Sequence, residues 1–271
     1  MRRSKVNMDS GKGLVMCIFS SEVTSVKSTK IYARYASRER QLLVYSMAYE
    51  AQDDLAMILP LPTPPGQSGS ALKFIDLSGY PEFFDDIDRS FPLPRVVYRS
   101  PGETRATLPV YEVGSFEASF APSQADFAQL DSRFRLPEVV WGALPHYHDY
   151  GFAVFKLKAG ARNVHPIAFT FPTRDSTTLF FPTTHIHHGE VTAKAEFDHV
   201  LYWQAAVPMS PDSAPFNYWR IEVSERPIAR HVDLDRAAGV LVPNLSLRRI
   251  SIYGPYPNQD IVLIPQNLDE S

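Results

Sequence analysis

The chain has 271 residues, with 27 Lys and Arg side chains against 30 Asp and Glu, so its net charge is close to neutral. The absence of a basic stripe argues against a nucleic-acid-binding protein, and no apolar run reaches the ~18 residues that a membrane helix requires. A single cysteine excludes an intrachain disulfide, so we expect a soluble, cytoplasmic protein.

The first third of the chain is rich in short strand patterns. Residues 1–13 are polar and charged, and we expect a disordered leader there, with Met8 or Met16 as an alternative translation start. In residues 40–50 both alternating faces are largely apolar, which predicts a central strand covered on both sides. Strands are predicted at 14–20, 29–36, 40–50, 54–62 and 71–78.

About three helices are predicted, all between residues 80 and 145 or just beyond. In the first, over 80–90, three apolar residues share one face, and the acids opposite them are expected to face solvent. Ser123 is expected to cap the second helix, and Pro137 to open the third, which Pro145 ends. The residues of the first helix are Phe83, Phe84 and Ile87 on the apolar face and Asp85, Asp86 and Asp88 on the polar face; the other two helices span 123–134 and 137–147.

A second run of strands follows residue 150. Strands that precede helices and then resume after them predict an α+β fold that is predominantly β, with antiparallel or mixed, sandwich-like sheets. We expect one globular domain over residues 14–271, with a possible subdivision near 100–108. The remaining strands are predicted at 95–98, 108–123, 150–160, 165–173, 177–187, 197–207, 218–227, 246–254 and 260–265.

Several short motifs between residues 17 and 185 follow one another in a distinctive order. They are the early cysteine segment at 17–20, ILPLPTPP at 58–65, YEVGSFEAS at 111–119, a helix at 125–130, Leu-Pro at 136–137, FAVFKLKAG at 152–160 and PIAFTFPT at 166–173. This order resembles a bacterial protein family that carries a domain of unknown function. The resemblance implies the β-rich fold and brings no established catalytic residues.

Two His-x-His pairs are the first candidates for chemistry. Side chains two residues apart in a strand point the same way, so each pair can present two imidazoles to one metal ion. A catalytic zinc needs three protein ligands and an open position, which two converging pairs satisfy. The competing interpretation is loop histidines near a strand end. The candidate ligands for zinc or another divalent metal are His146, His148, His185 and His187, with Asp149 and Glu190, and further Asp198 and His199, as possible additions.

Cys17 is the second candidate. It follows Met16, as in N-terminal nucleophile hydrolases that expose a cysteine after Met removal, and a free α-amino group there would act as the base. A start at Met16 or cleavage of the leader would be required. The competing interpretation is a small buried residue in a first strand, which its apolar neighbours favour.

Aromatic residues are dense at 199–204 and 216–220, a composition that suits either a partner surface or a core. The sequence contains no phosphate-binding glycine loop and no Gly-x-Ser-x-Gly elbow. We therefore expect, first, a non-catalytic binding or structural module that contacts a protein partner or associates with itself, without an assigned cofactor. The alternatives are a divalent-metal-dependent hydrolase built on the histidine pairs and a hydrolase that uses Cys17.

Overall fold

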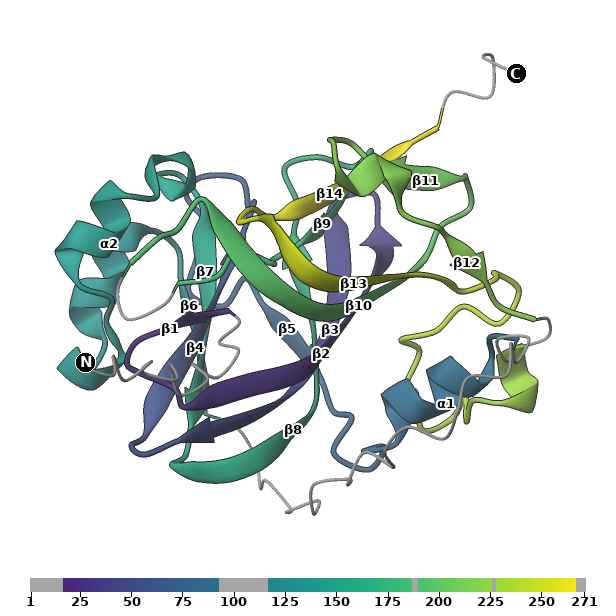
Figure 1. Ribbon diagram of the computed structural model, residues 1–271, viewed down its shortest axis with the longest axis horizontal. Helices are drawn as coiled ribbons and strands as arrows, with labels where there is room; N and C mark the ends of the chain where they lie inside the picture. Colours follow the sequence, from purple (N-terminus) through teal and green to yellow (C-terminus); the bar gives the residue numbers. More distant parts are fainter. Residues whose placement is uncertain (1–16, 93–116, 187–189, 226–227, 267–271) are drawn as a thin grey trace, which may run out of the picture.

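A twisted seven-stranded sheet forms the centre of the computed structural model, which describes residues 17–92, 117–186, 190–225 and 228–266 (Figure 1). All neighbouring strands in this sheet are antiparallel except β2 and β10, which are parallel, so the sheet is mixed. In sheet order the strands are β12 (Glu222–Val223), β13 (Arg248–Pro257), β10 (Lys194–Gln204), β2 (Ser25–Ser37), β3 (Arg40–Ala51), β8 (Gly160–Pro172) and β5 (Lys73–Ile75).

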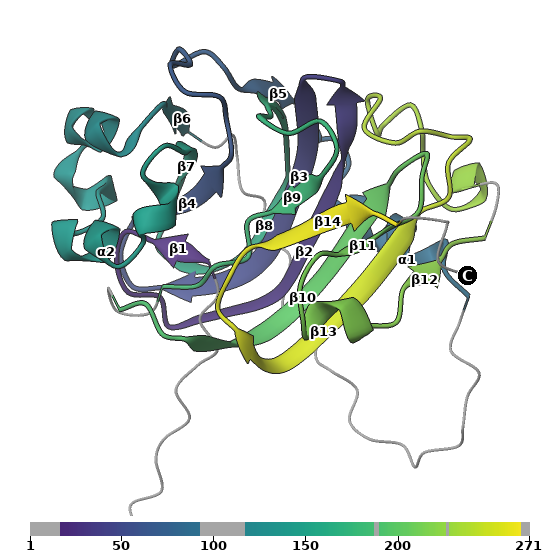
Figure 2. The same ribbon diagram turned by 90° about the horizontal axis from the view of Figure 1, so that it is seen from above.

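Two smaller antiparallel sheets lie against one face of the central sheet (Figure 2). The four-stranded sheet has the order β1 (Ile18–Phe19), β4 (Leu55–Leu61), β7 (Gly151–Leu157) and β6 (Ala118–Ala121). The three-stranded sheet has the order β11 (Met209–Pro211), β14 (Ile261–Pro265) and β9 (Leu179–Phe181).

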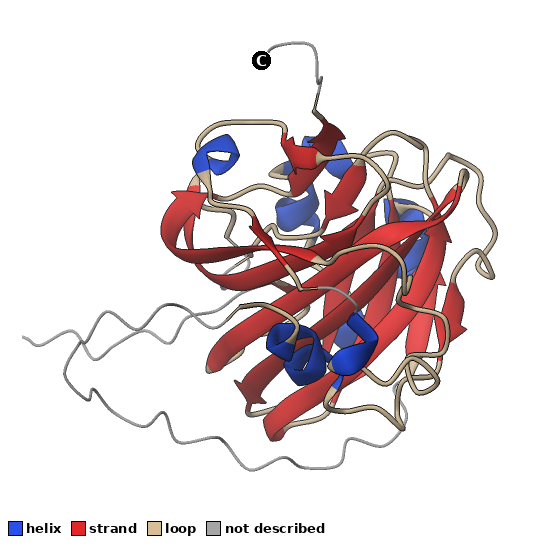
Figure 3. Cartoon of the chain, turned by 90° about the vertical axis from the view of Figure 1, so that its right-hand side faces the viewer, coloured by secondary structure: helices blue, strands red, loops and turns tan. Residues whose placement is uncertain are grey.

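Helices are short and lie outside the sheets (Figure 3). The α-helices are α1 (Phe83–Arg89) and α2 (Glu138–Gly142), and the 3-10 helices are η1 (Gln124–Gln129), η2 (Ser132–Phe134), η3 (Pro145–Tyr147), η4 (Phe216–Tyr218) and η5 (Ile228–Arg230). Strands dominate helices in the described residues, which confirms the predicted α+β class with a β majority.

Three apolar clusters hold these layers together. The largest fills the space between the central sheet and the two smaller sheets. A second lies on the opposite face of the central sheet, under α1 and the segment 228–247. The third lies between the four-stranded sheet and the helical segment 124–147. The strands β3 and β4 contribute to two clusters each, because alternate residues point to opposite faces.

The prediction of a central strand at 40–50 is confirmed. β3 lies between β2 and β8, and its two faces enter different clusters. Tyr45 and Met47 pack between the sheets, whereas Leu42 and Val44 pack under α1.

The second predicted helix is wrong in type. Residues 124–134 form two 3-10 turns, because Leu130 adopts an extended backbone that interrupts them. The Ser123 hydroxyl donates to the Asp126 carboxylate at 2.7 Å and makes no capping hydrogen bond to the backbone. Pro137 precedes the first turn of α2, which ends at Gly142 and is shorter than expected.

Some expectations fall outside the described residues: the leader at 1–13, the strand at 95–98, most of the strand at 108–123 and the subdivision near 100–108. In the described part of the chain, none of the helices has the length and apolar character needed to cross a membrane.

Candidate functional site

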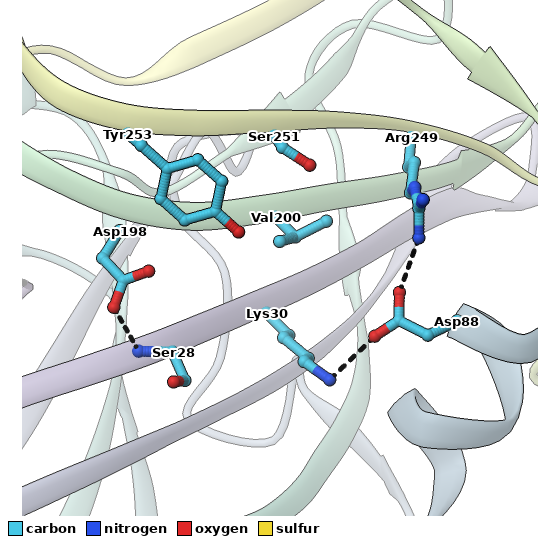
Figure 4. Close-up of a pocket in the computed structure, with 8 residues that line it drawn as sticks. All are labelled: Ser28, Lys30, Asp88, Asp198, Val200, Arg249, Ser251 and Tyr253. Carbon is cyan, nitrogen blue, oxygen red and sulfur yellow. Dashed lines mark hydrogen bonds and ion pairs between the residues drawn. The ribbon is translucent and has the colours of Figure 1, made fainter. Parts of the chain in front are cut away.

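A polar groove crosses the outer face of the central sheet beside α1 (Figure 4). Its volume is about 340 Å³. The lining side chains come from β2, β10, β13 and α1 and are Ser28, Lys30, Asp88, Asp198, Val200, Arg249, Ser251 and Tyr253.

Strand alternation places these side chains together. In β13, Ile250 and Ile252 enter the core, so Arg249, Ser251 and Tyr253 face the groove. The register then aligns the neighbouring strands: Asp198 of β10 pairs with Tyr253, and Val200 pairs with Ser251 on one side and Lys30 on the other. Ser28 and Tyr253, which are 253 − 28 = 225 positions apart in sequence, therefore share one surface.

One end of the groove is formed by a network of ion pairs and hydrogen bonds centred on Asp88. The Asp88 carboxylate accepts hydrogen bonds from Lys30 Nζ at 2.9 Å and from Arg249 Nη1 at 2.9 Å. The Tyr202 hydroxyl donates to the same carboxylate at 2.6 Å. Burial of Tyr202, together with the charge of Asp88, raises the pKa of its phenol well above the ordinary value. Asp88 thereby attaches α1 to β2, β10 and β13.

The two cations of this network have further acidic partners. Lys30 Nζ also contacts Asp85 at 3.3 Å, and Arg249 Nη2 also contacts Glu222 at 2.9 Å. Burial opposes the charge of Arg249, but the hydrogen bond and charge of Glu222 outweigh it and raise the pKa of the guanidinium. Arg249 also lies over the Phe91 ring, 4.3 Å from its centroid. Both cations are therefore neutralised within the protein.

The other end of the groove has a different character. Asp198 accepts a hydrogen bond from the Ser28 backbone N–H at 2.9 Å, at the point where β2 departs from regular pairing and Ser28 has a positive φ of 54°. Tyr253, which is 57% exposed, lines the groove at this end. Val200 and Ser251 lie between the two ends (Figure 4). Asp198 is the one charged lining residue at this end of the described groove.

The prediction that Asp85, Asp86 and Asp88 face solvent is wrong for two of these three acids. Asp85 is exposed, but Asp86 is buried and accepts a hydrogen bond from the Tyr80 hydroxyl at 2.6 Å. Asp88 is half-buried in the ion network. The physical reason differs between the two: Asp88 meets the sheet cations Lys30 and Arg249, whereas Asp86 contacts the Tyr80 hydroxyl and Arg89 of its own helix. The helix pattern alone reveals neither set of contacts.

Cys17 is a buried core residue in this structure. Its side chain is 3% exposed, and its thiol is in hydrogen-bond contact with the Tyr45 hydroxyl at 2.5 Å. Burial raises the pKa of the thiol to about 12, against the opposing effect of the Tyr45 hydrogen bond. The described conformation therefore holds a protonated thiol at neutral pH, whereas the thiolate is the nucleophile. Its use by a hydrolase stays a prediction.

Two of the eight histidines lie together in the core. The rings of His185 and His199 are both fully buried and stack with centroids 5.2 Å apart. Phe197 packs on both rings. The residue after His185 also contacts the backbone of Cys17: the Ile186 N–H donates to the Cys17 carbonyl at 3.1 Å.

The first His-x-His pair lies in a different environment. His146 and His148 are exposed on and just after η3, and Tyr147 between them is buried, with its hydroxyl 2.8 Å from the Thr184 hydroxyl. The segments that carry the two pairs thus meet through Tyr147 and Thr184, not through the described imidazoles.

The remaining metal candidates are also separate. Asp149 forms an ion pair with Arg174 at 2.8 Å, Glu190 is exposed, and His187 lies outside the described residues. Within the described ranges, no group of three or more His, Cys, Asp or Glu side chains could hold a metal ion. The metal site stays a prediction.

The groove was not predicted from the sequence, although the pattern of β13 contains one signal for it. In β13 the apolar Ile250 and Ile252 alternate with Arg249, Ser251 and Tyr253, a pattern typical of a strand with one polar face. The partners Lys30 and Asp88 have no local signal, because only the tertiary fold brings them to that face.

The chain was compared with known proteins on the basis of family models and solved structures. No family model matches it, so the resemblance to a bacterial family stays a prediction. Among solved structures it is similar to baculovirus P35, with a TM-score of 0.53 and 13% sequence identity over 93% of this chain and 100% of P35. The two chains share a fold.

Two further structures that contain P35 show lower similarity. A mutated P35 after caspase cleavage matches with a TM-score of 0.48 and 12% identity, over 89% of this chain and 100% of that one. A chain of the caspase-8/P35 complex matches with a TM-score of 0.43 and 10% identity, over 88% and 96%.

Proposed function

We propose that this chain is a non-catalytic protein-binding module whose partner is a protease of the caspase class. The observation that carries the proposal is the fold shared with P35, which extends over 93% of this chain and all of P35. P35 is a protein that binds caspase-8 in a solved complex. The proposal transfers that class of partner to this chain by analogy of fold.

The chemistry of the polar groove supports a binding role. Its cations Lys30 and Arg249 are paired with Asp88 and with further acids, so their charges are compensated within the protein. The described lining includes the hydroxyls of Ser28 and Ser251 but neither a histidine nor a cysteine that could activate them. The rims of protein–protein interfaces are polar and solvent-accessible, and Tyr is enriched in such interfaces, so this lining suits contacts with a partner.

Binding of the purified chain to caspase-8 tests the proposal directly. The chain would be immobilised and titrated with active caspase-8, with caspase-8 whose active site is blocked by a covalent peptide inhibitor, and with trypsin as an unrelated protease. We expect a Kd of about 1 µM or tighter for active caspase-8, in the range of specific protein complexes, and no binding of trypsin. Equal binding of both proteases, or of neither, contradicts the proposal.

The divalent-metal hydrolase is the second candidate function. It rests on the meeting of the segments that carry the two His-x-His pairs, which Tyr147 and Thr184 join. A bound metal stabilises the folded state, so a chelator would lower the melting temperature and zinc would restore it. Substituting both His146 and His148 by Gln would abolish that response if they are ligands. Elemental analysis without bound metal in the same sample opposes this candidate.

A further inference from the structure

Two polar side chains lie next to each other in the core of the protein. Thr29 of β2 and His199 of β10 are both 0% exposed, and the parallel register of the two strands pairs them directly. Within the described residues, neither the Thr29 Oγ1 nor either ring nitrogen of His199 has a hydrogen-bond partner. We propose that an ordered internal water molecule binds between these two side chains as a structural ligand of the fold.

The surroundings of His199 single out Thr29 as its polar neighbour in the sheet. Phe197 and Leu201, two positions away on the same strand, belong to the apolar core, and so does Ile252, its partner in β13. Nearly all buried polar atoms in folded proteins bond to protein or to an ordered water. A water that reaches both Thr29 and His199 gives each of them that bond.

A third polar group lies beside Thr29. The Tyr45 hydroxyl is in hydrogen-bond contact with the Cys17 thiol at 2.5 Å. Burial raises the pKa of the Tyr45 phenol, and the nearby Thr29 hydroxyl opposes the rise, although no hydrogen bond of normal geometry joins these two groups. Because a phenol oxygen both donates and accepts, Tyr45 can bond to Cys17 and to a water at once. Buried waters typically have about two to four polar partners, a number that these groups supply.

The backbone next to Thr29 departs from regular pairing. The register of β2 with β3 shifts between Lys27 and Lys30, and Ser28 there has a positive φ of 54°. The register of β3 with β8 shifts at the neighbouring position, between Tyr45 and Met47. Such irregularities leave a residue outside the ladder and disrupt the local packing. Two of them side by side favour a small internal site at this point.

A high-resolution crystal structure of the full chain tests the site directly. We expect electron density for one water at about 2.7–3.2 Å from both the Thr29 Oγ1 and a ring nitrogen of His199. A direct hydrogen bond between the two side chains, or a dry contact without density, would overturn the inference. Density that elemental analysis assigns to a metal ion would overturn it as well.

Thr29→Val tests the site in solution, since valine has the shape of threonine without its hydroxyl. We expect it to raise the unfolding equilibrium constant, measured by urea denaturation, about fivefold or more, because the water and His199 lose a partner. Thr29→Ser keeps the hydroxyl, so its crystal structure should retain the water that Thr29→Val loses. A hydroxyl buried in a dry core predicts the opposite result, an unchanged or smaller unfolding constant for Thr29→Val.

A double-mutant cycle separates the water site from a general effect of the hydroxyl. In the His199→Phe background we expect Thr29→Val to change the unfolding constant by about twofold or less, since the bridge is already lost. Tyr35→Phe is the matched control: it removes another hydroxyl on the same face of β2 that has no partner among the described residues, six positions from Thr29. Its effect should add to that of Thr29→Val.

An undiminished effect of Thr29→Val in the His199→Phe background would overturn the inference. Equal coupling of Thr29→Val to His199→Phe and to Tyr35→Phe would do the same. These measurements use the chain alone, so their outcome is independent of the binding of caspase-8.

Discussion

The imidazole rings of His185 and His199 stack in the core with centroids 5.2 Å apart and planes 15° apart. Both side chains are fully buried, and neither ring nitrogen of His199 has a hydrogen-bond partner among the described residues. The ring stack connects β10 to the segment that follows β9. Protonation of His199 would place a charge inside this core contact.

Acid should destabilise the protein through His199. Burial lowers the pKa of its imidazole from 6.5 to about 3, so the unfolded chain binds the proton first as the pH falls. The contribution of His199 to the free energy of unfolding is therefore fully present above about pH 6.5. It is lost progressively towards pH 3, by at most about 1.4 kcal/mol per pH unit. Urea denaturation across that window measures the slope.

His199→Phe should flatten this slope, since it keeps a planar ring next to His185 and Phe197 without a titratable group. His148→Gln, at an exposed position, is the matched control and should leave the slope unchanged. An identical pH dependence in the parent and in His199→Phe would show that His199 does not titrate in this way.

The Cys17 thiol should be inert in the folded protein. It is 3% exposed, and burial raises its pKa to about 12, so little thiolate forms at neutral pH. Iodoacetamide at pH 7.5 should therefore modify the native chain slowly and the urea-unfolded chain rapidly, as intact-mass measurement would record. Rapid labelling of the native chain would instead support Cys17 as a nucleophile.

Loss of Asp88 should be more costly than loss of Asp85 from the same helix. Asp88→Ala leaves Lys30, Arg249 and Tyr202 without a shared acceptor, at a cost of about 2 kcal/mol in the free energy of unfolding. Asp85→Ala removes an exposed partner and should change it by no more than about 0.5 kcal/mol. Urea denaturation of both variants measures the difference, and equal losses would refute the role given to Asp88.

Local patterns in the sequence predict the β-rich fold because burial repeats with the period of a strand. The two apolar faces of residues 40–50 correctly predict the central position of β3. Phe83, Phe84 and Ile87 likewise predict the buried face of α1. Each of these predictions depends on neighbouring residues, whose side-chain directions the local backbone determines.

The polar groove depends on contacts that no local pattern contains. Ser28 and Asp198 are 170 positions apart, and they meet because β2 and β10 pair in parallel. Asp88 reaches Arg249 across 161 positions. A helix pattern treats Asp88 as a solvent-facing acid, since the cations that neutralise it become neighbours only after the sheet has formed.

The most direct test of the central claim is size-exclusion chromatography with light scattering on the chain mixed with caspase-8. A protein-binding module for a caspase-class protease predicts a peak whose mass equals the sum of both proteins, absent when trypsin replaces caspase-8. Separate elution of the two proteins at about 10 µM each, well above the Kd that we expect, would contradict the account. A peak that contains only the chain at twice its mass would point instead to self-association.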